Sequence, residues 1–370
     1  MNSAEIKSIN KKKIYELIYE RKNIAKSDIA SILGLSFPTV SLIIKELASI
    51  GVVEEAGYFQ SAGGRKAAII SSISDTKIAI GVEILKESIE IVAIDIYGNI
   101  LKSHKQNLIF ESSALYFLQF GNFVNNFIIA LNLSYEKILG VGIGIQGLVT
   151  RDGSKVIFGN ILNSNGISCE DFARNIQFPC ILFHDSEAAA NAELWDTKDI
   201  INAFYISLNR NIGGSAIINS QIHWGSTYPS GLIEHMTIDL NGVKCYCGKK
   251  GCFETCCSAQ ALLKDLNMSL EQFFDKLHSG NKECAKRWND YLYYLSVAID
   301  NLQMAINCDI IIGGPVASYM TAKDVTELKE LIEKDSSFND GRLEIRLDSC
   351  VSVAKGAALH YIKQFINSIG

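Results

Sequence analysis

Residues 245–254 read CYCGKKGCFE, a stretch that places three thiols in the pattern C-x-C-x4-C. Three thiolates supply three of the four tetrahedral ligands that structural zinc requires. His235 lies ten residues before the first of these cysteines and is the nearest candidate for the fourth ligand. We therefore expect His235, Cys245, Cys247 and Cys252 to form a structural Zn2+ site. A redox pair or inert thiols are the alternatives.

The length and composition of the chain limit the kinds of protein it can be. At 370 residues and 48% hydrophobic content the chain is too long for one compact core, which favours two or three domains. No apolar run approaches the roughly 20 residues of a membrane helix, and the lysine-rich start has no hydrophobic segment of the secretory kind. We expect a cytoplasmic protein with no membrane partner, in which ten cysteines do not form a disulfide framework.

The charge of the chain is unevenly distributed. The formal net charge of −5 argues against a general nucleic-acid coat. Residues 1–80 hold eleven Lys or Arg against eight Asp or Glu, which gives +3, and the remainder holds 24 against 32, which gives −8. A mildly basic head on an acidic body suits local contact with DNA.

Apolar residues at helical spacing predict three helices within residues 7–47. The second helix has Ser27 as its expected N-cap, and Gly34 supplies the left-handed residue that ends it. The third helix begins directly after its expected cap, Ser36. Two helices joined by a short turn with glycine are typical of a helix-turn-helix, and residues 51–59 predict a hairpin wing.

The exposed face of the third helix presents short hydrogen-bond donors and a cation, which suit base edges and phosphates. The cationic segment after the wing is able to follow a phosphate backbone or enter a minor groove. The DNA-contacting residues that these features predict are Ser36, Thr39, Ser41, Lys45, Arg65 and Lys66. A small three-helix bundle that binds a protein is the alternative.

From residue 77 onward strands and helices alternate, which predicts an α/β body. A meander of strands, a helix and a buried strand follow one another, and the same succession recurs after Ala203, which indicates two lobes. The expected divisions are a head and linker over residues 1–70, a first lobe over residues 75–185 completed by the terminal helix at 353–370, and a second lobe with the metal site over residues 186–352.

The set HMTIDLNGVKCYCGKKGCFETCCS at residues 235–258 resembles the zinc-binding signature of the ROK family of repressors, open reading frames and kinases. The winged head followed by Gly63-Gly64-Arg65 resembles the xylose and N-acetylglucosamine repressor branch of that family. The resemblance covers nearly the whole chain. It implies a two-lobed, actin-like ATPase (ribonuclease H-like) body, with a sugar held in the cleft near the zinc.

The nucleotide side departs from the pattern of the ROK kinases. Where these kinases carry D-x-G-G-T, residues 80–85 read IGVEIL, and where they carry G-T-G-I-G-G-G, residues 209–215 read NRNIGGS. Side chains therefore stand where backbone amides approach phosphate closely. The resemblance implies no catalytic residue and no enzyme activity, with Asp185 at the vestigial position of the kinase base. A sugar kinase with a fused DNA-binding head is the alternative.

The sugar side matches the family better. Residues 184–190 resemble its N-D-x-N-A-x-A stretch, Asn160 resembles an asparagine that contacts sugar hydroxyls, and Glu254 matches a glutamate that reaches a sugar hydroxyl. The ligand-binding residues that the resemblance implies are Asn160, Asp185, His235 and Glu254. One departure from the family pattern is Leu232. Family members read G-E-I-G-H where residues 231–235 read GLIEH, so a carboxylate that binds the sugar in the family is absent here.

Together these features predict a sugar-responsive transcriptional repressor. A homodimer, or a dimer of dimers, would place two third helices one helical turn apart on palindromic double-stranded operator DNA. A small sugar effector that closes the two lobes would change this geometry, and zinc would act indirectly by fixing the loop that holds His235 and Glu254. A repressor controlled by a protein partner is the alternative that Leu232 leaves open.

Overall fold

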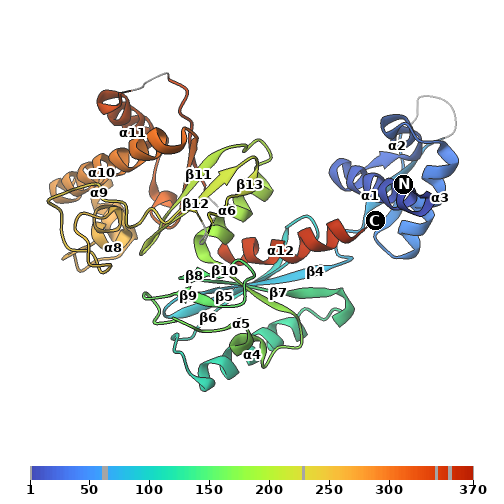
Figure 1. Cartoon of the computed structure of the whole chain (residues 1–370), viewed down its shortest axis with the longest axis horizontal. Coiled ribbons are helices and arrows are strands. Elements are labelled where there is room, and N and C mark those ends of the chain that lie inside the picture. The colour runs from blue at the N-terminus through green and yellow to red at the C-terminus, as the bar shows by residue number, and fades with distance from the viewer. Residues whose placement is uncertain (1, 61–65, 227–229, 338–340, 349–351, 370) are drawn as a thin grey trace.

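The computed structural model describes residues 2–60, 66–226, 230–337, 341–348 and 352–369. Figure 1 shows a small amino-terminal head and a body of two lobes. Strands and helices alternate through the body, which confirms the predicted α/β class. In the part of the chain just defined, no single helix is long and apolar enough to cross a membrane. Two short helices of the head reach the required length and apolar composition only when they are counted as one bent segment.

The head is a helix-turn-helix with a small sheet. Its elements are α1 (Ser3–Arg21), β1 (Ile24–Ala25), α2 (Lys26–Leu33), α3 (Phe37–Ser49), β2 (Val53–Tyr58) and β3 (Ala68–Ser72). Gly34 adopts φ +63° and ends α2 in the left-handed conformation, as predicted. The chain bends by 118° between α2 and α3, an angle typical of helix-turn-helix units. The two helices bury Ile29, Val40 and Leu47 in one core.

Two local expectations for the head were wrong. Ser27 lies inside α2, whose N-cap is Ala25 without a side-chain bond, because β1 pairs with β3 and leads directly into the helix. The wing hairpin is not contained in residues 51–59. Strand β2 pairs with β3 instead, so the second wing strand comes from Ala68–Ser72, and residues 61–65 between them lie outside the described part.

The first lobe is built on a five-stranded sheet in the order β10-β7-β4-β5-β6. Strands β4, β5 and β6 form an antiparallel meander, and β4, β7 and β10 run parallel. The strand bounds are β4 Ile78–Ile84, β5 Ser88–Ile94, β6 Ile100–Asn107, β7 Ile138–Ile145 and β10 Cys180–His184, and a small hairpin adds β8 Leu148–Val149 and β9 Val156–Phe158. Figure 1 shows α4 (Ala114–Ile129) and α5 (Cys169–Ala173) on one face of the sheet and α12 (Val353–Ser368) on the other.

The second lobe repeats this topology. Its sheet has the order β13-β12-β11-β14-β15, again an antiparallel meander followed by parallel strands. The strand bounds are β11 Ala203–Leu208, β12 Ile212–Ile218, β13 Gln221–Ile222, β14 Asp309–Gly313 and β15 Ile345–Leu347, and the helices are α7 Phe253–Cys257, α8 Ala259–Leu262, α9 Leu270–His278, α10 Lys282–Ile306 and α11 Ala322–Asp335. The recurrence predicted after Ala203 is confirmed by this shared strand order.

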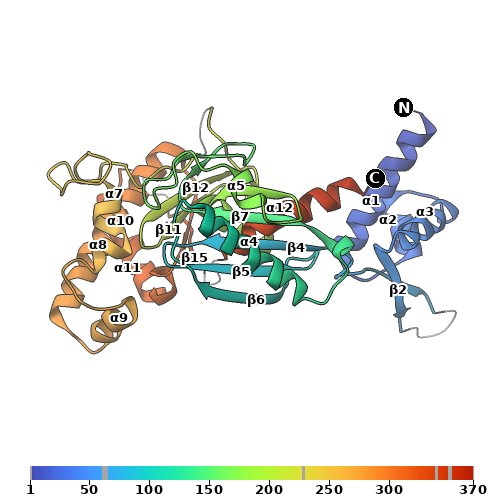
Figure 2. The ribbon, with the colours of Figure 1, turned by 90° about the horizontal axis from the view of Figure 1, so that it is seen from below.

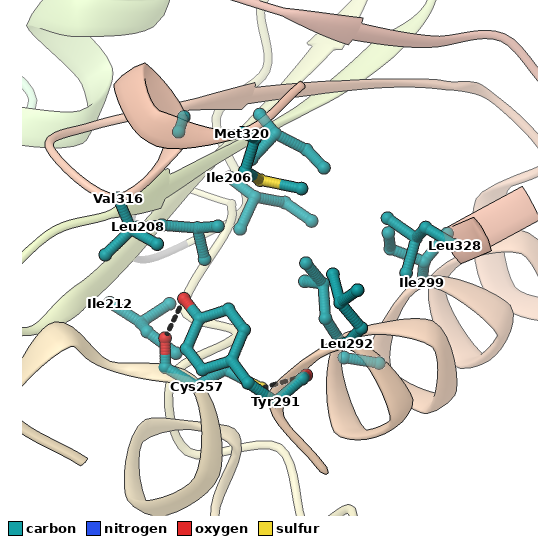
Figure 3. Packing of buried hydrophobic residues seen from close by; sticks show 14 of the residues in the cluster. Ile206, Leu208, Ile212, Cys257, Tyr291, Leu292, Ile299, Val316, Met320 and Leu328 are labelled. Atoms are coloured by element: carbon teal, nitrogen blue, oxygen red, sulfur yellow. Dashed lines mark hydrogen bonds between the residues drawn. The ribbon is translucent and has the colours of Figure 1, made fainter. Parts of the chain in front are cut away.

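The core of the second lobe ties α7 to α10. Figure 3 shows Tyr291 on α10 donating its hydroxyl to the carbonyl oxygen of Cys257 at 2.6 Å, while Cys257 Sγ donates to the carbonyl oxygen of Tyr291 at 3.6 Å. Both side chains are buried among Ile206, Leu208 and Leu292. Because α7 begins at Phe253, directly after Cys252, this core also anchors the cysteine-rich loop.

Helices α6 (Asp185–Asp196) and α12 cross between the lobes at very close range. A Cβ on Gly356 of α12 would overlap the carbonyl oxygen of Ala188 on α6, and a Cβ on Gly81 of β4 would overlap the carbonyl oxygen of Ala354. Asn191 of α6 also donates to the Gly356 carbonyl at 2.7 Å. The two helices therefore form a rigid unit that glycine alone permits.

The head docks on the far end of this unit. Figures 1 and 2 both show the carboxyl end of α12 beside α1. Ile369 is buried in the core of the head, and Phe365 packs against it. Tyr19 of α1 donates to the carbonyl oxygen of Ile96 at 2.8 Å and stacks on Tyr97 with ring centroids 4.8 Å apart. The head is thus held by the body through side-chain packing.

We predict that Gly356→Ala destabilises the protein. Helix propensity alone would stabilise the folded state by about 1 kcal/mol, but the overlap with Ala188 costs roughly 1–3 kcal/mol, so the steric effect wins. Thermal denaturation measures the difference. The matched control is Asn301→Ala at an exposed position of α10, which should leave the melting temperature unchanged or slightly raised; a melting temperature that rises for Gly356→Ala would contradict the close packing.

Candidate functional site

A polar cavity lies between the two lobes, where β7 and β10 end and β12 begins. Crevices at the carboxyl ends of parallel strands are the usual ligand sites of α/β proteins. The volume of the cavity is about 50 Å³. Its polar lining consists of Gln146, Asn160, His184, Asp185, Asn211, Glu234, His235 and Tyr246.

Three of the four residues expected to bind a ligand line this cavity: Asn160, Asp185 and His235. Asp185 is the first residue of α6, and His184 occupies the N-cap position. The Asp185 carboxylate accepts from the backbone amide of Ser186 at 2.8 Å and lies 3.2 Å from Nε2 of His184. Burial lowers the pKa of His184, against the opposing effect of the Asp185 charge.

Asn160 lines the cavity from the loop after β9. Its Oδ1 accepts from Nδ2 of Asn165 at 2.9 Å, and Oδ1 of Asn165 accepts from the backbone amide of Gly159 at 2.6 Å. This pair of asparagines fixes the loop. The side-chain amide of Asn160 keeps its donor side for a ligand.

Glu254 does not join the other three expected ligand residues. It is 5% exposed, and its two oxygens accept from Nδ2 of Asn211 and from the backbone amide of Ile212, each at 2.7 Å. Burial raises the pKa of Glu254, and these two bonds oppose the rise. The carboxylate is directed at the turn of residues 209–212. No sequence pattern indicated this orientation of Glu254, because the orientation depends on where α7 lies relative to β12.

That turn belongs to the segment that resembles the second glycine-rich turn of the kinases. The backbone amide of Ile212 in it is bonded to the internal carboxylate of Glu254. A cavity of about 290 Å³ next to it is lined by Glu83, Asp185 and Asp348, with no Lys or Arg among the described residues that line it. Burial, with the charge of Asp185 next in effect, raises the pKa of Glu83 to about 8. This side of the cleft is unfavourable for polyanions.

The four expected metal ligands come together. One ligand atom from each of His235, Cys245, Cys247 and Cys252 lies within 4.8 Å of all the others. Nδ1 of His235 is 3.6 Å from Sγ of Cys245, and Sγ of Cys247 is 3.6 Å from Sγ of Cys252. The loop folds back because Gly251 adopts φ +65° against the carbonyl of Asp239, where a Cβ would overlap. One nitrogen and three thiolates fit the donor set of a tetrahedral metal ion.

The cluster is physically joined to the cavity. His235 belongs to both, and Tyr246, which lies between two of the cysteines, lines the cavity and packs edge-on against the His235 ring at 5.0 Å. Lys249 Nζ donates to the carbonyl oxygen of His235 at 2.7 Å. A metal bound by the cluster would hold one wall of the cavity in place.

The third helix of the head presents a mixed surface. Ser36 Oγ accepts from the backbone amide of Thr39 at 3.3 Å, so it caps α3 as predicted, and the two hydroxyls lie 2.8 Å apart. Of the other predicted DNA-contacting residues, Ser41 is half-buried, Lys45 and Lys66 are exposed, and Arg65 lies outside the described residues.

Two apolar side chains of α3 were not predicted as surface residues. Leu42 is 55% exposed on the face opposite the buried Val40 and Leu47, and Phe37, the first residue of the helix, is 54% exposed. Such side chains are able to contact thymine methyl groups in a major groove. The position of Leu42 on a helical wheel, outside the apolar stripe of α3, was the available signal.

Known protein families match the body and the head of this chain separately. Residues 79–337 match the ROK family model, and residues 7–54 match a winged helix-turn-helix DNA-binding model. The chain is 27% identical over 315 residues to the xylose repressor of Bacillus spizizenii, which covers 83% of this chain and 82% of that protein. It is 25% identical over 262 residues to the N-acetylglucosamine repressor of Escherichia coli O6:H1, over 70% of this chain and 64% of that protein.

Solved structures share the fold. A ROK family transcriptional regulator, a homologue of the E. coli MLC protein, superimposes with a TM-score of 0.79 at 20% identity, over 98% of this chain and 96% of its own. The ROK hexokinase of Thermus thermophilus gives a TM-score of 0.64 at 17% identity, over 79% of this chain and 100% of its own. The expected resemblance is confirmed: this chain belongs to the ROK family, with a winged helix-turn-helix head joined to its body.

Proposed function

We propose that this protein is a sugar-responsive transcriptional repressor that binds operator DNA through α3 and a sugar in the cleft between its lobes. The observation that carries the proposal is the pairing of a helix-turn-helix head with a ROK body whose phosphate turn is filled by its own Glu254. The similarity to the xylose and N-acetylglucosamine repressors supports a sugar as the signal.

We also infer that the body does not transfer phosphate. The backbone amide of Ile212 is already bonded, and the neighbouring cavity presents Glu83, Asp185 and Asp348 where a nucleotide would bring its phosphates. Asp185 keeps the ability to accept a hydrogen bond from a sugar hydroxyl. An assay of phosphate transfer from ATP to hexoses and pentoses should find no turnover; turnover abolished by Asp185→Asn would favour a kinase.

Helix α6 supports a route from the sugar to the head. It begins at Asp185 in the cavity, and near its other end Nε1 of Trp195 donates to the carbonyl oxygen of Tyr97 at 2.7 Å. Tyr97 in turn stacks on Tyr19 of the head. A sugar whose entry displaces the α6 wall of the cavity would move the surface on which the head docks.

The repressor would act as a homodimer or a dimer of dimers. Two copies of α3 one helical turn apart would read a palindromic operator, and a sugar that changes their separation would oppose DNA binding. Control by a protein partner instead of a sugar is distinguished by calorimetry, in which a panel of hexoses and pentoses would all fail to bind.

We propose zinc as the ion of the His235 cluster. Its role would be structural, because all four donors come from the protein and a closed site leaves no position for a substrate. The link through Tyr246 and His235 would let the ion fix the cavity wall.

Operator binding should depend on Lys45. We expect Lys45→Ala to weaken retention of operator DNA, selected from genomic fragments, and to lower the slope of log affinity against log salt by about 1, because one phosphate contact is removed. Lys286→Ala, at an exposed position of α10 in the second lobe, is the matched control. Equal salt slopes for both variants would exclude α3 as the DNA-reading helix.

Metal removal should disturb both stability and sugar binding. We expect Cys247→Ser, or treatment with a chelator, to remove stoichiometric zinc, to lower the melting temperature by about 5 °C or more, and to weaken sugar binding. Cys256→Ser removes a thiol outside the cluster and should change neither property. Wild-type protein purified without stoichiometric metal would contradict the assignment.

A further inference from the structure

One carboxylate oxygen of the cleft has no hydrogen-bond partner among the described residues. Oε2 of Glu234 is buried and forms no hydrogen bond with any described residue, although Glu234 lines the same cavity as Asp185. Its polar neighbours are engaged: Asn160 accepts from Asn165, and Asp185 accepts from the next backbone amide. Among the described residues that line this cavity, Glu234 is the one with a buried side-chain oxygen that lacks any hydrogen-bond partner.

A buried carboxylate oxygen that has lost its water without gaining a hydrogen-bond donor destabilises the folded state. Native structures supply such oxygens with a hydrogen bond from a protein group, a water molecule or a ligand. A carboxyl group accepts hydrogen bonds when it is ionised, and it also donates one when it is protonated. A ligand hydroxyl both donates and accepts hydrogen bonds, so it can pair with Glu234 in either form.

The charges around the cavity restrict the class of ligand further. Among the described residues that line it there is no Lys or Arg, whereas Asp185 and Glu234 both present carboxyl groups. The amino-terminal end of α6 would favour an anion, but one amide of its first turn, that of Ser186, is already bonded to the Asp185 carboxylate. A phosphate ester, which brings a charge of about −1.5 to −2, would find no lysine or arginine among the described lining residues.

We propose that Glu234 selects the effector, and that the effector is an unphosphorylated sugar, one hydroxyl of which forms a hydrogen bond with Oε2 of Glu234. The inference rests on the proposed function, because it names the ligand class of the same cleft. It separates a repressor that senses a free sugar from one that senses its phosphate ester.

Leu232 provides a matched control on the same segment. Its side chain is 37% exposed, and Leu232 is not among the described residues that line the cavity. A substitution there changes the same loop without changing the proposed contact. Glu234→Gln keeps the shape of the side chain and one acceptor oxygen, and Glu234→Leu removes both oxygens.

The test is isothermal titration calorimetry on the full-length, zinc-loaded protein. The probes are xylose, glucose and N-acetylglucosamine, together with glucose 6-phosphate and N-acetylglucosamine 6-phosphate. The proteins are the wild type, Leu232→Ala, Glu234→Gln and Glu234→Leu. Zinc content and retention of operator DNA are measured for every variant, so that loss of the fold is recognised.

We expect at least one unphosphorylated sugar to bind the wild type and Leu232→Ala with equal affinity, and no phosphate ester to bind as tightly. Glu234→Leu should weaken that binding by roughly 10- to 100-fold, while zinc content and operator retention stay unchanged. Glu234→Gln should weaken sugar binding by a smaller factor.

Two results would overturn the inference and leave the proposed function standing: a phosphate ester that binds the wild type more tightly than its parent sugar, or a Glu234→Leu variant with unchanged affinity. If none of the five probes binds while operator DNA is still retained, sugar sensing fails together with this inference. Loss of operator retention in the wild type would instead refute the DNA-binding half of the proposed function.

Discussion

The close contact between α6 and α12 is the constraint on which the rest of the structure depends. Gly356 allows the backbone of α12 to lie against Ala188, and Gly81 and Gly142 allow the same helix to lie against β4 and β7. Larger side chains at these positions would push the helix away from the sheet. The result is a stiff unit whose one end forms the wall of the cleft at Asp185 and whose other end supports the head.

The cleft divides into two halves with different chemistry. The half near His235 keeps polar groups that suit hydroxyls, and the cysteine cluster braces it. In the other half Glu254 occupies the phosphate turn, and three carboxyl-bearing residues line the adjacent cavity. A single short segment, from Cys252 to α7, serves both halves, because it supplies one metal ligand and the carboxylate that fills the turn. The proposed loss of nucleotide binding and the proposed sugar pocket therefore both depend on this segment.

Much of this arrangement could be predicted from the sequence, because short-range patterns encode it. Helical spacing located the helix-turn-helix, Gly34 marked the end of α2, and the spacing of His235 and the three cysteines predicted a cluster that the structure brings together. The N-cap of α2 was mispredicted, since Ser27 has the right chemistry but β1 leads directly into the helix two residues earlier.

Features that depend on contacts distant in sequence could not be predicted. The second wing strand is separated from the first by residues 59–67, so local turn signals did not reveal it. Whether Glu254 faces a sugar or the turn before Ile212 depends on the packing of α7 against the second sheet. The unpartnered oxygen of Glu234 and the stacking of Tyr19 on Tyr97 likewise required the folded structure.

The central claim is that sugar and operator compete through one connected scaffold. Its most direct test is the affinity of the purified protein for its sugar, measured by calorimetry with and without saturating operator DNA. Linkage requires operator DNA to weaken sugar binding by the same factor by which sugar weakens operator binding, and we predict a factor of about 5 to 150. Equal sugar affinities in the presence and absence of operator would contradict the account.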